Sequence, residues 1–405
     1  MGISDPIRDD VAEAVDICMN SAGVRVIIVT GDTPGTALEI GRQIGLIVGG
    51  GDGEIISGPE FAKLSDEEAM KVIGKLKIIS RARPDDKARL VMLLQKMNEV
   101  VAVTGDGTND APALSKAQVG LSMGDGTSRA KEASDITIID NSFASINKAI
   151  MWGRSLYLNI RRFIIFQMTI NLCACLIVLL GAFIGYDSPL TVTQMLWVNL
   201  IMDTFAAMAL SSLPPDKSVL NEKPRNPNSH IIDRGMLWRI VLTGISFFVF
   251  LAGLWQYMFH VEFTSVRGLL DAENIRIFFS EMFSLEKKSL HLSGKEMGVY
   301  FSIFVLMQFW NLFNVKYFRT NNSLIGDVID LFCNRQRVKE SYNKYFLLIA
   351  AVIILGQVAI VTFAGDVFNV ERISLNDWLW IIIITSPVLL IPDIVRFVSG
   401  LGRGK

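Results

Sequence analysis

The sequence predicts two joined parts: an α/β domain with a parallel sheet over roughly the first 150 residues, then an all-α membrane domain. Two apolar, β-branched runs, Val24–Val29 and Val100–Val103, each lead into a loop that begins Thr-Gly-Asp. Helical patterns alternate with the predicted strands, as in doubly wound folds. Beyond about Ser155, six long apolar runs each approach the roughly 20 residues that a helix needs to cross a bilayer.

Composition agrees with two unlike parts. The hydrophobic share of 51% exceeds what one soluble domain needs, yet charged residues still make up 20% of the chain. The charged residues concentrate before the apolar runs. A net charge of −1 and dispersed basic residues argue against nucleic-acid binding. Four cysteines, two of them inside an apolar run, do not form a disulfide framework.

The α/β domain has its polar residues at predicted strand ends. Because both Thr-Gly-Asp loops follow apolar runs, we expect these two strands to be neighbours in one parallel sheet, with ligands outside their carboxyl ends. Further expected strands are residues 119–123 and 136–139, and expected helices are residues 9–22, 36–44 and 84–97.

The loop from Thr104 to Leu114 is the most informative segment. It places two glycines and the carboxylates of Asp106 and Asp110 in a tight turn. Carboxylate oxygens suit Mg²⁺, and glycines let backbone amides approach a phosphate. An ordinary Gly/Asp turn is the alternative interpretation. The order of the loop residues favours a Mg²⁺ and phosphate site.

The membrane domain is predicted to contain six spans. The fourth is the shortest, and the distribution of Lys and Arg places the α/β domain, the Pro-rich loop 214–227 and the C-terminus in the cytoplasm. The six spans are Phe163–Ile184, Val192–Leu213, Leu237–Phe259, Gly298–Phe313, Tyr345–Ala364 and Leu375–Val395.

Polar residues inside these spans indicate an ion pathway. Asn199 and Asp203 are four residues apart, which places them on one face of a regular helix. An ionisable group at membrane depth costs at least ~2.5 kcal/mol and indicates transport. Asn171 in the preceding span is a weaker candidate, because Asn also joins membrane helices. For Gln308, a role as an ion ligand and a role in joining membrane helices are equally supported.

These residues together resemble the P-type cation-transporting ATPases, specifically plasma-membrane-type calcium pumps (type IIB), over nearly the whole chain. The segment Gln194–Thr204, with Pro214-Pro215 after it, is similar to the sixth membrane helix of those pumps. Four segments resemble successive motifs of their phosphorylation domain: Ser4–Arg8, Thr30–Asp32, Arg81–Lys87 and Thr104–Leu114.

The resemblance implies a partial haloacid-dehalogenase-like (Rossmannoid) phosphorylation domain, followed by helices five to ten of a ten-helix pump. The implied domains are 1–150 for the C-terminal part of the phosphorylation domain, 151–162 for a stalk, 163–398 for the membrane domain and 399–405 for a short cytoplasmic tail.

The resemblance also assigns roles to single residues. Lys87 would neutralise the phosphoryl group, and Thr30 and Asn109 would hydrogen-bond its oxygens. Arg81, Gly31 and Asp32 would help to hold ATP. Asp106 would hold Mg²⁺ in a loop ordered by Asp110. The oxygens for transported Ca²⁺ would come from Asn171, Asn199 and Asp203.

Two departures from the family pattern change the expected activity. The phosphorylated Asp of Asp-Lys-Thr-Gly-Thr does not occur in these 405 residues, so we expect a C-terminal portion that is inactive without an N-terminal half. Residues Ala174 and Met202 replace oxygen ligands of reticulum-type pumps, which predicts a single Ca²⁺ site. Three ligands are fewer than the six to eight oxygens that Ca²⁺ takes.

The expected function is therefore ATP-driven Ca²⁺ transport by a multi-pass protein of the cell membrane. Its expected partners are membrane lipid, Ca²⁺, ATP and the other half of the pump, with no nucleic acid. Three alternatives stay open: a pump for Na⁺, H⁺ or Mn²⁺, an inactive or regulatory fragment, and a soluble-type phosphatase.

Overall fold

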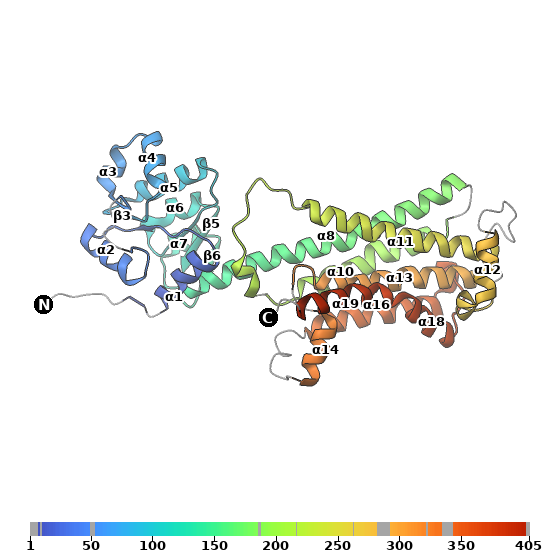
Figure 1. Cartoon of the computed structure of the whole chain (residues 1–405). Coiled ribbons are helices and arrows are strands. Elements are labelled where there is room, and N and C mark those ends of the chain that lie inside the picture. Colours follow the sequence, from blue (N-terminus) through green and yellow to red (C-terminus); the bar gives the residue numbers. More distant parts are fainter. Residues whose placement is uncertain are drawn as a thin grey trace. The chain divides into compact units, whose positions relative to one another are not determined.

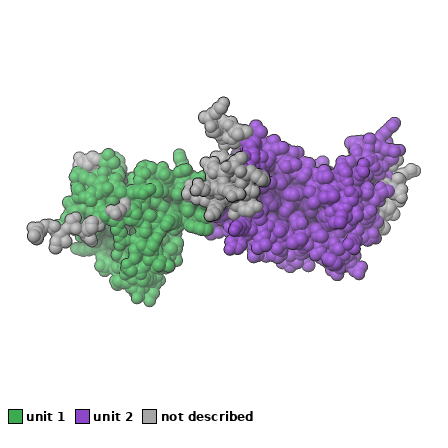
Figure 2. All heavy atoms as spheres, turned by 90° about the horizontal axis from the view of Figure 1, so that it is seen from below, with its two compact units in different colours: residues 1–155, 215–230 green, residues 156–214, 231–405 purple. Residues whose placement is uncertain are grey.

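The computed structural model describes residues 7–8, 10–48, 53–184, 188–215, 217–261, 263–281, 292–320, 323–333 and 343–401. Ser4–Pro6 of the first predicted motif and residues 402–405 of the predicted tail lie outside them. The chain divides into two compact units. Unit 1 is residues 1–155 with 215–230, and unit 2 is residues 156–214 with 231–405 (Figure 2).

The strands of unit 1 form two three-stranded parallel sheets, which confirms the predicted α/β class. The first has the order β1 (Ile28–Val29), β3 (Ile78–Ser80), β2 (Ile55–Ser57), and the second β4 (Ala102–Gly105), β5 (Val119–Met123), β6 (Ile136–Ile138). The central strand β3 is fully buried and β5 is buried over its middle. Parallel strands covered by helices on both faces show this burial.

Short helices connect these strands, as the alternating pattern predicted (Figure 1). Two of them, α3 (Gly58–Lys63) and α4 (Asp66–Ile73), begin with capping boxes, in which Ser57 pairs with Glu60 and Ser65 with Glu68. The helical elements of unit 1 that precede the membrane spans are α1 (Val11–Asp16), the π-helical η1 (Ile17–Ser21), α2 (Pro34–Gln43), α3 (Gly58–Lys63), α4 (Asp66–Ile73), α5 (Pro84–Lys96), η2 (Thr108–Asp110), α6 (Ala111–Lys116) and α7 (Ser128–Glu132).

One topological prediction is wrong. The strands before the two Thr-Gly-Asp loops are not neighbours: β1 pairs with β3, and β4 pairs with β5 in the other sheet. The prediction missed the short strands β2 and β3. Strand β3 takes the place beside β1 with Ile28 opposite Ile78. The shared tripeptide therefore reflects similar loop chemistry at two strand ends and does not indicate adjacent strands.

Helix α5 is held firmly against its neighbours. The guanidinium of Arg89 donates to the carbonyls of Phe61 at 2.8 Å and Leu64 at 2.6 Å, near the C-terminal end of α3. It also pairs with Asp66 at 3.0 Å, and Lys96 pairs with the same carboxylate at 2.8 Å. These contacts fix α5, which carries Lys87, against α3 and α4.

We expect the Asp66 pairing to fail in acid. Hydrogen bonds from Lys96 and Arg89 hold the pKa of Asp66 below its usual 3.8. A lowered pKa means that the stabilisation is present above 3.8 and is lost as the pH falls through the folded-state value. In thermal unfolding followed by circular dichroism, Asp66→Asn should lower the midpoint at neutral pH and match the wild type below that value. An equal deficit at both pH values would contradict this assignment.

Unit 2 is helical and contains the six predicted spans. The structure confirms them as six helices long and apolar enough to cross a membrane, at 144–184, 192–211, 234–260, 294–316, 344–363 and 375–398. Their elements are α8 (Ala144–Ile184), α9 (Val192–Leu196), the π-helical η3 (Trp197–Met202), α10 (Asp203–Ser211), α11 (Arg234–His260), α13 (Gly294–Lys316), α16 (Lys344–Phe363), α18 (Leu375–Thr385) and α19 (Pro387–Leu401). The connections contain η4 (Lys217–Asn221) in unit 1, and η5 (Arg267–Leu270), α12 (Ala272–Glu281), α14 (Leu324–Cys333) and α17 (Gly365–Phe368).

Helix α13 is the centre of this bundle. It packs against α11, α16, α18 and α19, and nearly all of its residues from Gly298 to Val315 are buried. Its polar residues explain the weak apolar signal of the fourth predicted span. They point into the bundle, where helices and not lipid surround them.

Candidate functional site

The phosphate-type loop is built around a contact between Lys87 and Asp110. The ammonium of Lys87 on α5 lies 2.6 Å from Oδ1 of Asp110, and both side chains are largely shielded from solvent. Asp110 Oδ2 accepts hydrogen bonds from the backbone amides of Asp106 at 3.3 Å and Gly107 at 3.2 Å. Asp110 therefore orders the loop and links it to α5.

Gly105 is required at the start of this loop. A Cβ atom at position 105 would lie 2.4 Å from Cβ of Asp110, far inside van der Waals contact. The absent side chain lets the Asp110 carboxylate fold back over the turn. Gly105 is therefore needed because it leaves space for the Asp110 side chain, and not only because glycine favours a tight turn.

The Thr30 loop is tied to the start of α5 by backbone hydrogen bonds. The amide of Ala82 donates to the carbonyl of Thr30, and the amide of Arg81 donates to the carbonyl of Asp32, both at 2.9 Å. Arg81 has φ +48°, a left-handed conformation that non-glycine residues adopt rarely and that often marks functional loops. Backbone hydrogen bonds thus join the Thr30 loop to the turn before α5, and Lys87 joins α5 to Asp110.

The remaining predicted phosphate ligands lie at the protein surface. Asp32, Asp106 and Asn109 are exposed, and Thr30 is half-buried. The Thr30 hydroxyl donates to Asp32 Oδ2 at 2.7 Å and accepts from the Asp32 amide at 3.1 Å. Within the described part of the chain, the Asp106 carboxylate forms no hydrogen bond, so its oxygens are free for a cation.

Sequence reasoning gave no role to Gly58 and Asp86. A Cβ atom at Gly58 would lie 2.5 Å from the Arg81 carbonyl oxygen and 2.9 Å from Asp86 Oδ2. The buried Asp86 carboxylate accepts from the Arg83 amide at 2.8 Å and so caps α5. The sequence shows the pair of Asp residues at the start of α5, but it does not show that the first residue of α3 lies so close to this turn.

We expect Gly58→Ala to damage the site without touching its polar residues. The added methyl would displace the backbone at Arg81, and overpacking of this kind costs about 1–3 kcal/mol. Hydrogen–deuterium exchange of peptides over 78–87 should rise in the variant. Gly35→Ala is the control, because a Cβ atom there meets nothing within 4 Å. Equal exchange in the two variants would contradict the packing argument.

The predicted cation ligands of unit 2 differ in exposure. Asp203 is 3% exposed, and both of its carboxylate oxygens lack a hydrogen-bond partner in the described part of the chain. Asn171 is half-buried on α8, and Asn199 is exposed on η3. A buried carboxylate without a partner is costly and needs a cation or another donor.

The helix that bears Asn199 and Asp203 is not the regular α-helix assumed from their spacing. Residues Trp197–Met202 form the π-helical η3, and α10 begins at Asp203. A π-helical turn widens the helix and is frequent at functional sites. Asp203 is buried and Asn199 is exposed, a difference that a spacing of four residues on a regular helix does not predict. Apolar β-branched and aromatic residues in this segment carry no π-helix signal.

The chain thus combines a parallel α/β unit, in which Lys87 and Asp110 order one loop, with a bundle of apolar helices. Among the described residues, the buried Asp203 carboxylate of that bundle has no hydrogen-bond partner. The family model for the C-terminus of cation-transporting ATPases matches residues 187–398. Models for haloacid dehalogenase-like hydrolases match residues 1–118 and 88–150. The chain belongs to the cation-transporting ATPase family.

Curated relatives agree with this assignment. Over 93% of this chain, it is 39% identical to Calcium-transporting ATPase 2 of Schizosaccharomyces pombe. Over 96% of the chain, it is 37% identical to Plasma membrane calcium-transporting ATPase 1 of Mus musculus and 36% identical to Plasma membrane calcium-transporting ATPase 4 of Homo sapiens. The chain spans 26%, 31% and 30% of the lengths of these relatives, respectively.

Proposed function

We propose that this chain forms the C-terminal part of an ATP-driven calcium pump of the plasma membrane. The observation that carries the proposal is Asp203, a carboxylate at membrane depth that is 3% exposed and has no partner among the described residues. Its relatives are named as calcium-transporting ATPases. A bound Ca²⁺ would supply the charge that the carboxylate lacks.

Asn171 and Asn199 are the proposed further ligands. Among the described residues, neither side chain forms a hydrogen bond, so their amide oxygens are available. Three residues provide fewer oxygens than the six to eight that Ca²⁺ takes. The others would come from water and from a membrane segment outside these 405 residues.

The phosphate loop is proposed to act on a phosphoryl group that originates from ATP. Lys87 would present its remaining ammonium protons to that group while Asp110 holds the ammonium in place. Thr30 and Asn109 would donate to phosphoryl oxygens after the Thr30 hydroxyl turns from Asp32. Gly31, Asp32 and Arg81 would position the nucleotide beside them.

Mg²⁺ fits the donor set of this loop. The Asp106 carboxylate is exposed and has no hydrogen bond within the described ranges, whereas both Asp110 oxygens are already occupied. Asp106 would therefore hold the metal, and Asp110 would order the loop. When bound, Mg²⁺ neutralises charge on the phosphoryl oxygens. The phosphorylated Asp would come from the part of the pump outside this chain.

A chimera tests the proposal. Residues 1–405 would replace the matching portion of the Schizosaccharomyces pombe ATPase, and membrane vesicles would be assayed for Ca²⁺-dependent ATP hydrolysis and uptake of radioactive calcium. We expect both activities. Stimulation by Na⁺, H⁺ or Mn²⁺ but not by Ca²⁺ would assign another cation. A folded chimera that no cation stimulates would favour a regulatory role.

The same chimera tests the proposed single Ca²⁺ site. Ala174 and Met202 are both 1% exposed and provide no oxygen side chains beside the proposed ligands. We expect one Ca²⁺ transported for each ATP hydrolysed. A measured ratio of two would contradict the single site and leave the pump function intact. Incubation of the 405-residue chain alone with ATP and Ca²⁺ should give no phosphoenzyme, because the nucleophile is absent.

A further inference from the structure

The helix that carries Asn199 and Asp203 has α16 as its main neighbour in the bundle. Two of the buried residues of α10, Ala206 and Ala209, are both 0% exposed. Small residues let membrane helices approach closely, because little side-chain volume separates their backbones. Close packing against α16 therefore helps to set the position of the proposed cation ligands.

One end of this contact is joined by Asn343, which directly precedes α16. Its amide nitrogen donates to the carbonyl of Ser212 and, at 3.0 Å, to the Ser212 hydroxyl. Its amide oxygen accepts from the backbone amide of Tyr345 at 2.9 Å and so caps α16. Since Ser212 directly follows α10, a single side chain joins the C-terminal end of α10 to the N-terminal end of α16.

The other end is joined by Gln194. This side chain is 0% exposed, and its amide nitrogen donates to the carbonyl of Phe368 at 2.8 Å. Its amide oxygen accepts from the Thr191 amide at 3.1 Å and closes the capping box that begins α9. Phe368 ends α17, the short helix that follows α16. The segment from Gln194 to Ser212 is therefore attached at both ends to α16 and its flanking residues.

Trp197 meets Gly356 between these two attachments. A Cβ atom at position 356 would lie 2.9 Å from Cη2 and 3.2 Å from Cζ2 of the Trp197 ring. Non-bonded carbon atoms make their best contact at about 3.5–4.0 Å, so a side chain at position 356 would have to displace the ring. From Trp197 to Ser212 the chain advances 15 residues, about 22 Å of α-helix. From Asn343 to Gly356 it advances 13 residues, about 20 Å, as expected for antiparallel helices in contact along their lengths.

Packing, and not a hydrogen bond, holds the Trp197 ring on Gly356. The ring Nε1 is buried and has no hydrogen-bond partner in the described part of the chain. Gly356 is also the only glycine of α16, and glycine inside a helix is destabilising relative to alanine. The residue at position 356 is therefore explained by the ring that it admits and not by helix formation.

The contact lies directly before the proposed cation ligands. Trp197 is the first residue of the π-helical η3, and Asn199 and Asp203 follow it by two and six residues. The π-helical turn is the irregular part of this span, so a push on Trp197 displaces the backbone there more readily than in α9 or α10. The position of the ring on Gly356 is thereby coupled to the positions of both ligands.

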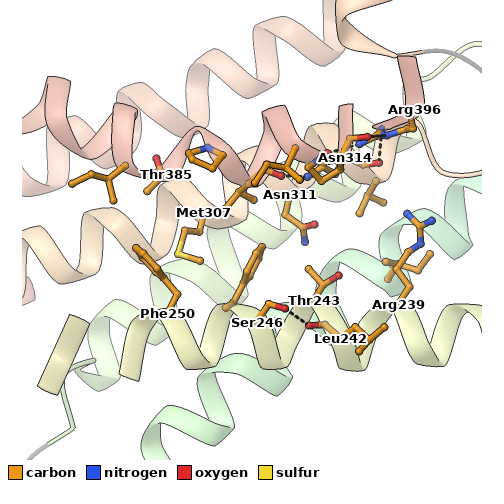
Figure 3. Close-up of a pocket in the computed structure, with 18 residues that line it drawn as sticks. Arg239, Leu242, Thr243, Ser246, Phe250, Met307, Asn311, Asn314, Thr385 and Arg396 are labelled. Atoms are coloured by element: carbon orange, nitrogen blue, oxygen red, sulfur yellow. Dashed lines mark hydrogen bonds between the residues drawn. The ribbon is translucent and has the colours of Figure 1, made fainter. Parts of the chain in front are cut away.

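A pocket elsewhere in the bundle does not give this ring room to move. Helices α11 and α13 and the α18–α19 segment line a pocket of about 540 Å³ (Figure 3). None of the described residues that line it belongs to α9, η3, α10 or α16. Volume added at position 356 must therefore be taken up beside α16, either by turning of the Trp197 ring or by displacement of η3.

We propose that Gly356 is a positioning residue of the cation site: it admits the Trp197 ring and thereby sets where η3 holds Asn199 and Asp203. The attachments at both ends of the span, the ring contact between them and the irregular turn beside it support the same role. The effect on cation affinity rests on the proposed pump function, whereas the packing of Trp197 on Gly356 does not.

The chimera with the Schizosaccharomyces pombe ATPase tests this role through its Ca²⁺ dependence. The methyl of Gly356→Ala would lie roughly half an ångström inside carbon–carbon contact, and a binding site must be held to within about 0.5 Å. We expect the Ca²⁺ concentration for half-maximal ATP hydrolysis to rise about tenfold, since a misplacement of 1 Å can cost about 100-fold. The rate at saturating Ca²⁺ should stay near that of the wild type. Gly253→Ala is the matched control and should change neither value, because a Cβ atom there, in α11, meets nothing within 4 Å.

A smaller ring should remove the effect. Phenylalanine lacks the Cη2 and Cζ2 atoms that meet position 356, so Gly356→Ala should change the Ca²⁺ dependence little once Trp197→Phe is present. Additive effects of these two substitutions would overturn the proposal. So would equal effects of Gly356→Ala and Gly253→Ala, or a lower rate at saturating Ca²⁺ with an unchanged Ca²⁺ dependence.

Hydrogen–deuterium exchange of the 405-residue chain in detergent separates this proposal from the pump function. Exchange of a peptide over 195–205 should rise severalfold in Gly356→Ala and stay at the wild-type level in Gly253→Ala. If no cation stimulates the wild-type chimera, the pump function fails, and a rise confined to Gly356→Ala still supports displacement of η3. Unchanged exchange in Gly356→Ala would overturn the positioning role whatever the chimera does.

Discussion

Asp203→Asn in the chimera is expected to abolish calcium transport and leave the stability of the helical unit unchanged or raised. The carboxylate is 3% exposed and its oxygens have no partner within the described ranges. Removing a buried charge that lacks a partner does not cost stability. It does remove the proposed charged Ca²⁺ ligand, so the Ca²⁺ concentration for half-maximal ATP hydrolysis should rise on the order of 100-fold or become unmeasurable.

Asp377 offers a matched control for this variant. It is also 3% exposed, but its carboxylate accepts from the Val266 amide at 2.9 Å and from the Ser374 hydroxyl at 2.7 Å. Asp377→Asn leaves one acceptor where two were needed, which costs about 1–3 kcal/mol. Its thermal midpoint should fall while each folded molecule still transports. If Asp203→Asn lost stability and kept transport, Asp203 would be a structural residue.

The sequence predicted the two-part organisation well because the apolar runs of the membrane helices are long. An apolar run of that length predicts a membrane helix whatever its neighbours are, and each of the six runs forms such a helix. The sheet order was less accessible, because β1, β2 and β3 contain only two or three residues each. Pairing at that length is decided by the packing of α2, α3 and α5, and not by strand propensity.

The candidate site also combines features that the local sequence predicts with contacts that only the fold creates. Asp106, Asn109 and Asp110 could be assigned to one loop because they lie close together in the sequence. The 2.6 Å contact between Lys87 and Asp110 joins residues 23 positions apart, and only the fold creates it. Likewise, Asp203 could be recognised as a charge in an apolar run, but the π-helical turn beside it could not. The resemblance to a family suggested roles for these residues, and the structure shows the contacts that order the loop.

Asp110→Ala is expected to loosen the phosphate loop more than Lys87→Ala. The first variant removes a carboxylate that accepts from Lys87 and from the amides of Asp106 and Gly107. The second removes one of these bonds and leaves the two amides bound. Hydrogen bonds to charged groups contribute about 1.5–3 kcal/mol. Amide exchange in a peptide over 104–114 should therefore rise roughly 10- to 100-fold in Asp110→Ala, and less in Lys87→Ala.

The double variant distinguishes a coupled pair from two independent residues. Once Asp110 is absent, the ammonium of Lys87 has lost the partner at 2.6 Å, so adding Lys87→Ala should change exchange little. Lys116→Ala is the control for removal of a lysine near the same loop, since Lys116 is exposed and contacts Met92. Additive effects of Lys87→Ala and Asp110→Ala would show that the contact does not order the loop. In the chimera, both single variants should slow phosphorylation, because the ammonium must be held where charge develops on the phosphoryl group.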